Sequence, residues 1–193
     1  MNLLSKATQP TIYFIGVTTK QSSIMKVFPQ WAKVLGLNNV VIKGIDIEIH
    51  ANPEVYREVV DFIKSDELSL GALVTTHKID LFNASRDMFE YLDPYASMFG
   101  ELSSISKKDG RLEGYAKDPI SSGLALEAFL PDNFFREHAG DVLLLGAGGS
   151  AIAMSAYLLN KDKGDNIPSR LIVGNRSMPR LDAIARYVAK INP

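Results

Sequence analysis

The sequence contains no cysteine among its 193 residues. This absence excludes disulfide bonds, thiolate nucleophiles and cysteine-ligated zinc, and it suits a reducing compartment, so we expect a cytoplasmic protein. Histidine is scarce as well: His50, His77 and His138 are scattered along the chain and show no metal-ligand spacing. We therefore predict no metal site.

An excess of charge of either sign is also missing. The chain has 21 Lys and Arg against 22 Asp and Glu, which gives a net charge of −1. A protein that binds nucleic acid or an anionic membrane surface is usually basic, so neither partner is expected. No apolar run approaches the length of a membrane span, and the first ten residues lack the pattern of a signal peptide. A small molecule is the expected partner.

What the sequence does contain is a regular alternation of apolar β-branched runs and helical patterns. Such an alternation is typical of an α/β protein with parallel strands. Asp109-Gly110 between two strand patterns predicts a hairpin, and Asp118-Pro119 predicts a helix with an acidic N-cap and proline at its first position. The predicted strands are 11–17, 40–49, 70–76, 101–105, 111–116, 142–145 and 170–174. The predicted helices are 24–35, 53–64, 119–130, 151–160 and 178–190, with further helical patterns over 79–98.

The motif at residues 142–151 carries the clearest chemistry. An apolar strand runs into a turn and a helix with the spacing G-x-G-x-x-A, in which the small residues are Gly146, Ala147, Gly148, Gly149, Ser150 and Ala151. The first glycine permits a tight turn, the second lets the backbone approach a pyrophosphate, and the small sixth residue lets the helix pack on its strand. The free N–H groups at the helix start favour the phosphate charge. A plain strand–helix turn is the alternative.

The end of the next strand indicates which dinucleotide would bind. There the chain has Asn175, Arg176 and Ser177, where a site selective for NAD would have Asp or Glu on the ribose hydroxyls. A guanidinium can hold a 2′-phosphate through charge-assisted hydrogen bonds, so we predict NADP as the cofactor. Tyr157 and Lys161 also spell the Y-x-x-x-K of short-chain dehydrogenases. In that family the pair lies on a later helix, whereas here it lies on the helix of the glycine motif itself. We therefore interpret Tyr157 as a packing residue and Lys161 as a surface residue.

The order of these motifs resembles the shikimate dehydrogenase family over nearly the whole chain. The glycine motif and the step at residues 175–177 are very similar to the family's pattern. Residues 100–118 (GELSSISKKDGRLEGYAKD) are similar to its G-A-V-N-T…G-x-L-x-G-x-N-T-D, and residues 73–78 (LVTTHK) to its V-T-x-P-x-K. Residues 22–37 align without a gap to its S-x-S-P…LGL segment.

The resemblance implies a fold and a domain order. It predicts a three-layer α/β substrate domain with a mostly parallel sheet at 1–118. A connector helix and a partial Rossmann-type NADP-binding domain follow at 119–193. The family's nucleotide domain continues through further strands that contact the nicotinamide, so this chain carries the adenine and phosphate end. A partial sheet exposes a strand edge and an apolar face, which favours self-association such as a homodimer.

The resemblance also implies roles for single residues. It makes Lys78 the catalytic lysine and Asp118 its carboxylate partner, although the bare sequence explains the first as a solvated lysine and the second as a helix cap. Hydride transfer from an alcohol requires removal of the hydroxyl proton, which such a lysine can carry. Ser22, Thr75 and Ser103 are the implied substrate-binding residues.

Several positions depart from the family's pattern. Ile24 stands where the family has its second carboxylate-binding serine, and Val74 where it has a substrate-binding threonine. Ser103 replaces an asparagine, and Ala116-Lys117 replace the N-T before the aspartate. A site that loses polar groups binds a polyol poorly, and Ile24 and Val74 would present apolar surface to it. We therefore expect a ring carboxylic acid other than shikimate.

The function predicted on these grounds is reversible hydride transfer between NADP(H) and a hydroxyl- or keto-bearing ring carboxylic acid, as in aromatic amino acid biosynthesis. A non-catalytic nucleotide-binding or interaction module derived from the same family is the alternative. A two-domain folate-type dehydrogenase has a similar layout, but the segments around Ser22 and Gly100–Asp118 match it less well.

Overall fold

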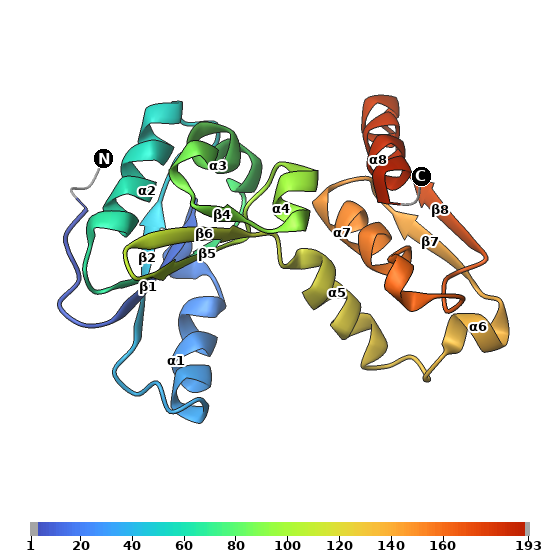
Figure 1. Cartoon of the computed structure of the whole chain (residues 1–193), viewed down its shortest axis with the longest axis horizontal. Coiled ribbons are helices and arrows are strands. Elements are labelled where there is room, and N and C mark those ends of the chain that lie inside the picture. The colour runs from blue at the N-terminus through green and yellow to red at the C-terminus, as the bar shows by residue number, and fades with distance from the viewer. Residues whose placement is uncertain (1–3, 192–193) are drawn as a thin grey trace. The chain divides into compact units, whose positions relative to one another are not determined.

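The computed structural model describes residues 4–191, and the chain divides into two compact units, residues 1–116 and 117–193 (Figure 1). The first unit holds the elements β1 (Thr11–Gly16), α1 (Ile24–Val34), β2 (Val41–Asp46), α2 (Pro53–Ser65), β3 (Ser69–Val74), α3 (Lys78–Ser85), β4 (Tyr91–Leu92), α4 (Pro94–Phe99), β5 (Ser104–Lys108) and β6 (Arg111–Tyr115), with 3-10 turns η1 (Thr19–Gln21) and η2 (Arg86–Met88).

The six strands of this unit form one sheet in the order β2-β1-β3-β5-β6-β4. Strand β1 pairs in parallel with β2 and β3, β4 pairs in parallel with β6, and β5 runs antiparallel between β3 and β6. Because parallel crossovers are right-handed, the step from β1 to β2 and the return from β2 to β3 put α1 and α2 on opposite faces. The layers seen in Figure 1 agree with this. The predicted α/β class with a mostly parallel sheet is confirmed.

The core of the first unit lies between this sheet and helices α2 and α3. Seventeen buried apolar side chains form one cluster, in which Ile15 from β1, Ile63 from α2 and Leu81 from α3 have no solvent exposure. Strand β1 is buried at five of its six positions, as expected of a central parallel strand covered on both faces. The carboxyl ends of β1, β2 and β3 therefore lie on a rigid support.

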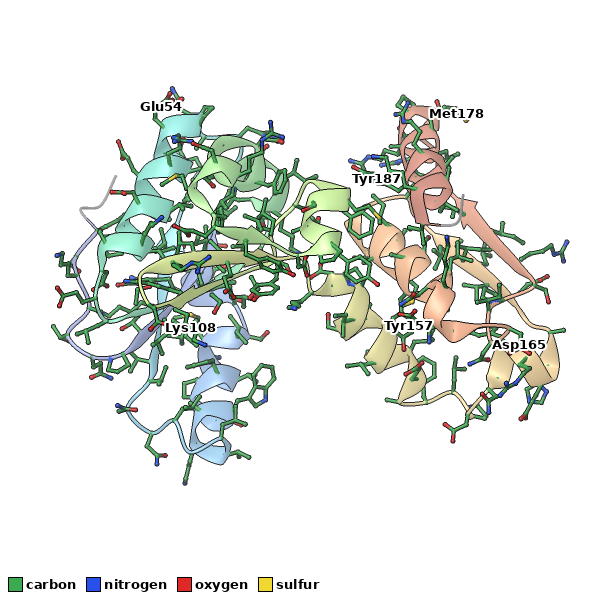
Figure 2. The ribbon with its side chains drawn as sticks, viewed as in Figure 1. Glu54, Lys108, Tyr157, Asp165, Met178 and Tyr187 are labelled. Atoms are coloured by element: carbon green, nitrogen blue, oxygen red, sulfur yellow. The ribbon has the colours of Figure 1, made fainter. Side chains whose placement is uncertain are left out.

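Two predictions for this unit are wrong in detail. The helical patterns expected over 79–98 form α3, η2 and α4, but the strand β4 lies between them; α4 begins after Asp93, which caps it by accepting a hydrogen bond from the Ala96 N–H at 2.6 Å. The fifth strand lies at Ser104–Lys108 rather than 101–105, and its hairpin turn lies next to Lys108, labelled in Figure 2.

The second unit consists of α5 (Asp118–Glu127), α6 (Phe134–His138), β7 (Asp141–Leu145), α7 (Gly149–Leu158), η3 (Lys161–Lys163), β8 (Arg170–Gly174) and α8 (Met178–Ile191). Strands β7 and β8 pair in parallel through five residue pairs. Helix α6 falls in the stretch 133–140 that the sequence pattern left without an element. Helix α5 ends at Glu127, three residues before the predicted end.

Helix α5 packs closely on α7 around one aromatic ring. A Cβ at Gly123 would overlap the Tyr157 ring, which lies between the two helices (Figure 2). Lys163 Nζ lies 3.9 Å from the centroid of the same ring, whereas Lys161 lies beyond the end of α7 and is exposed. Tyr157 is thus a packing residue and Lys161 a surface residue, as predicted for this Y-x-x-x-K spacing.

One face of the β7–β8 pair is open in the second unit. Leu143, Leu145 and Ile172 alternate with partly buried neighbours and are 59%, 87% and 45% exposed. Among residues 4–191, no helix is long and apolar enough to cross a membrane.

Candidate functional site

Hydroxyl-bearing side chains gather where β1 and β3 end. Parallel strands bring their carboxyl ends to one edge of a sheet, and at this edge of the first unit lies a pocket of about 230 Å³. Its lining includes Ser22 and Thr75, two of the three predicted substrate-binding residues, but no charged side chain. The lining residues are Phe14, Gly16, Val17, Thr18, Thr19, Gln21, Ser22, Thr75 and Thr76.

One wall of the pocket is fixed by Thr19 and Asp46. Asp46 at the end of β2 accepts hydrogen bonds from the Thr19 N–H at 2.8 Å and from its hydroxyl at 2.6 Å. Thr19 is buried against Gly44, where any Cβ would collide with the Thr19 side chain. This support was not predicted from the sequence, because it joins residues 27 positions apart.

The other wall is the turn from β3 to α3. Thr75 donates its N–H to the Ile15 carbonyl at 3.0 Å, and Leu102 donates its N–H to the Lys78 carbonyl at 3.1 Å. Between them, Thr76 has φ = 59°, a left-handed conformation that a β-branched residue rarely adopts. Lys78 is half-buried as the first residue of α3, so the turn sets the direction in which its side chain leaves the backbone.

Two sequence-based expectations about this region need correction or restatement. Val74 was expected to present apolar surface to the ligand, but it is buried in the core cluster, because strand alternation turns Val74 inward while Thr75 faces the pocket. Ser103 is buried, its hydroxyl lies 3.4 Å from the Tyr115 carbonyl, and it is not among the residues that line the pocket.

Asp118 opens the second unit. It is the first residue of α5, with Lys117 in the cap position, so the expectation that Asp118 itself caps the helix is wrong. Proline follows it at the start of the helix, as predicted. The role of Asp118 as a partner of Lys78 stays a prediction from the resemblance.

The glycine turn joins β7 to α7 in the second unit. Gly146 has φ = 120°, which side chains rarely allow, and a Cβ at Gly148 would meet no atom within 4 Å. Gly149 begins the ten-residue helix α7, with Gly148 as its cap. Gly146, Gly148, Gly149, Ser150 and Ala151 line a hollow of about 530 Å³ together with Leu143, Leu144, Leu145 and Met154.

The predicted selectivity residues lie beside this turn. The Gly146 N–H donates to the Gly174 carbonyl at 2.7 Å, which ties the turn to the end of β8. Asn175 Nδ2 donates to the Ser177 carbonyl at 3.3 Å, and Arg176 is exposed. The open space at Gly148 and the helix start are features that suit a phosphate group, whereas Arg176 does not line the hollow. Ala147 is buried and does not line the hollow either.

Metal chemistry has no support in the part of the chain described. Among residues 4–191, no group of three His, Asp or Glu side chains is arranged to hold an ion. The described residues form two hollows, a hydroxyl-lined pocket without charged side chains in the first unit and a hollow at the glycine turn in the second.

No protein-family model matches the chain. Among curated proteins it is similar to a shikimate dehydrogenase (NADP(+)) of Bacillus cereus, with 32% identity over 153 residues that cover 77% of this chain and 51% of the relative. It is also similar to a shikimate dehydrogenase (NADP(+)) of Methanocaldococcus jannaschii, with 28% identity over 72% of this chain and 44% of the relative. The chain spans about half the length of these curated relatives.

Solved structures show the same similarity. A shikimate dehydrogenase in complex with NADP+ covers 97% of this chain at 26% identity and a TM-score of 0.70, and the chain covers 58% of it. The shikimate dehydrogenase from Aquifex aeolicus shares the fold over 96% of this chain, with 21% identity and a TM-score of 0.73. The predicted resemblance to the shikimate dehydrogenases is therefore confirmed.

Proposed function

We propose, starting from this similarity to the shikimate dehydrogenases, that the chain carries the substrate-binding part and the phosphate-binding part of an NADP-dependent dehydrogenase. The reaction is reversible hydride transfer between NADP(H) and a ring carboxylic acid that bears a hydroxyl or keto group. One observation carries the proposal furthest: the open glycine turn at Gly148 is hydrogen-bonded through Gly146 to the strand end that precedes Arg176.

The cofactor assignment rests on chemistry at that strand end. An NAD site places a carboxylate on the ribose hydroxyls, whereas this chain has Asn175 and Arg176 there. An exposed guanidinium binds a 2′-phosphate through charge-assisted hydrogen bonds, which are stronger than a hydrogen bond to a neutral 2′-hydroxyl. The NADP(+) dependence named for the relatives agrees with this assignment.

The substrate class rests on the pocket at the ends of β1 and β3. Ser22, Thr75 and Thr76 supply hydroxyl groups, and the lining carries no charged side chain. Hydroxyl groups can donate to a carboxylate and accept from a ring hydroxyl, so a hydroxylated ring acid satisfies them. The solved relatives include one in complex with shikimate and NAD and a quinate dehydrogenase in complex with NAD, which bind acids of this kind. Ile24, at the family's second serine position, does not line this pocket, so the proposal of a related acid other than shikimate rests on the loss of that serine hydroxyl.

Lys78 is the proposed carrier of the proton. Bound NADP+ would supply the hydride acceptor for oxidation of the substrate's carbinol carbon. The hydroxyl proton must leave at the same stage, and an amine in reach of that oxygen can take it and return it in the reverse direction. The Leu102 hydrogen bond to the Lys78 carbonyl and the start of α3 hold the backbone of this residue in place. Asp118 is proposed to orient the lysine on the strength of the resemblance.

The test is a pair of measurements. Nicotinamide fluorescence follows titration with NADPH and with NADH, and absorbance follows turnover of shikimate, quinate and related ring acids with NADP+. We expect this chain to bind NADPH more tightly than NADH. Turnover of one ring acid is expected in a protein that also carries the family's nicotinamide-contacting strands, and it should disappear there in Lys78→Met while NADPH binding stays unchanged. Equal binding of the two cofactors would contradict the NADP assignment.

A non-catalytic module remains the second candidate function. The open face at Leu143, Leu145 and Ile172 favours it, because an exposed apolar strand face suits an interaction surface. This candidate predicts that NADPH and a ring acid bind but are not turned over. It also predicts that the wild type and Lys78→Met have the same dissociation constants for NADPH and for the ring acid.

A further inference from the structure

His77 is a buried polar residue that the proposed reaction does not use. It precedes Lys78, is only 1% exposed, and contacts Tyr56 of α2, which is also 1% exposed. His77 Nδ1 lies 3.2 Å from the Tyr56 hydroxyl, and the two rings are 5.6 Å apart at 54°. Among the described residues, nothing pairs with His77 Nε2.

Packing alone does not explain a histidine at this position. A buried polar atom without a hydrogen-bond partner costs free energy that an apolar ring of similar size would not. A hydrogen bond, however, fixes the orientation of a ring more narrowly than apolar contact does. The His77–Tyr56 pair therefore adds orientation to the core at the expense of stability.

The element that this orientation affects is the turn from Thr75 to Lys78. Backbone hydrogen bonds to Ile15 and Leu102 hold its two ends, and the His77 N–H donates to the Thr75 carbonyl at 2.5 Å. Thr76 lies between them with φ = 59°, is exposed and has no side-chain hydrogen bond to a described residue. A strained residue persists only where its surroundings over-determine it, and the buried ring next to it is the nearest side-chain anchor.

We propose that the buried His77–Tyr56 pair is a positioning pair that holds this strained turn. The pair thereby sets the Thr75 and Thr76 side chains in the pocket wall and Lys78 at the start of α3. Neither ring lines the pocket, so the pair acts through the turn and not on the ligand. The consequence for Lys78 and for ligand binding rests on the proposed function, whereas the structural claim about the turn does not.

The substitutions Tyr56→Phe and His77→Phe break the pair, and Tyr13→Phe is the matched control. Tyr13 Oη donates to Asp66 at 2.7 Å in the same core, so the control loses one buried tyrosine hydrogen bond at a different place. Hydrogen exchange is read at the amides of Leu81 and Leu102, which donate to the His77 and Lys78 carbonyls.

We expect exchange at these two amides to accelerate about tenfold relative to the rest of the unit in Tyr56→Phe and His77→Phe, but not in Tyr13→Phe. Adding Thr76→Gly, which removes the left-handed strain, should reduce that acceleration. Unchanged exchange in Tyr56→Phe, the milder variant that keeps the ring, overturns the proposal even if His77→Phe does not fold.

Binding of shikimate and quinate separates this proposal from the proposed function. If either acid binds the wild type, its dissociation constant should rise several-fold in Tyr56→Phe and stay unchanged in Tyr13→Phe. If neither acid binds but the exchange result holds, the substrate class has failed and the positioning pair stands. A ligand that binds both variants as it binds the wild type contradicts the link between the pair and the pocket.

Discussion

The two units bury their sheets to different extents. In the first unit a six-stranded sheet with helices on both faces encloses seventeen buried apolar side chains. In the second unit two strands leave Leu143, Leu145 and Ile172 open to solvent. The pocket of the first unit thus rests on a closed core, whereas the proposed phosphate site at the glycine turn of the second rests on an open sheet. This difference predicts that substitutions and acid change the stability of the two units by different amounts, and that the two units differ in their tendency to self-associate.

The largest expected effect comes from the closed core. Leu81→Ala in α3 removes a side chain without solvent exposure and should cost about 2–5 kcal/mol in the free energy of unfolding. Ile172→Ala on the open face of the second unit should cost less than about 1 kcal/mol, because much of its surface is already in water. Urea unfolding followed separately in each unit measures both, and equal costs would contradict the comparison.

The second effect tests where the second unit is packed tightly. Gly123→Ala places a Cβ in the Tyr157 ring and should destabilise the α5–α7 contact by about 1–3 kcal/mol, although alanine is the better helix former. Gly148→Ala meets no atom within 4 Å and is the matched control, which should leave thermal unfolding unchanged. A Gly123→Ala protein as stable as the wild type would show that the two helices are not in close contact.

The third effect concerns acid and the first unit. Burial raises the pKa of Asp66, but hydrogen bonds from Tyr13, Ala7 and Leu68 and the charge of Lys107 outweigh it and hold this pKa below its usual value of 3.8. A depressed pKa contributes stability above the unfolded value, and that stability is lost as the pH falls through the folded value. The first unit should therefore lose stability as the pH falls below 3.8.

Asp66→Asn provides the comparison for the acid effect. At pH 7 it should be less stable than the wild type, and the difference should shrink as the pH falls below 3.8, because protonation removes the same charge from the wild type. Chemical unfolding at a series of pH values measures this. Parallel pH profiles of the two proteins would rule out Asp66 as the source.

The smallest effect on stability is expected on the open face. Leu145→Ser should change the free energy of unfolding by less than about 0.5 kcal/mol, since the side chain is 87% exposed. Its effect should appear in association instead, because an exposed apolar strand face favours contact between copies. Light scattering over a concentration series should show weaker self-association in the variant, and the same mass in both proteins would dismiss the predicted homodimer contact.

Local signals accounted for most of the fold. The β-branched runs gave the strands β1, β3 and β8, and the glycine spacing gave the turn between β7 and α7. Asp-Pro correctly marked the start of α5, and the same signal at Asp93-Pro94 would have located the start of α4 within the helical patterns expected over 79–98. Helix α6 was missed because its first amides donate to Asn166 Oδ1, a contact 30 or so positions away along the chain.

The candidate site was harder to predict than the fold. Ser22 and Thr75 were predicted from the resemblance, and both line the same pocket at the ends of β1 and β3. The Thr19–Asp46 bonds and the left-handed Thr76 depend on how distant strand ends meet, which no short pattern records. The inward direction of Val74 was available from strand alternation, but alignment to the family's threonine concealed it.

The central claim is that the second unit binds the phosphate-bearing end of NADP. Calorimetric titration with adenosine 2′,5′-bisphosphate and with adenosine 5′-phosphate tests it most directly, because these ligands represent the adenine ends of NADP and NAD. We predict that the bisphosphate binds more tightly, and that Arg176→Ala removes most of this preference while leaving thermal unfolding unchanged. Equal affinities in the wild type, or a preference that survives Arg176→Ala, would contradict the account.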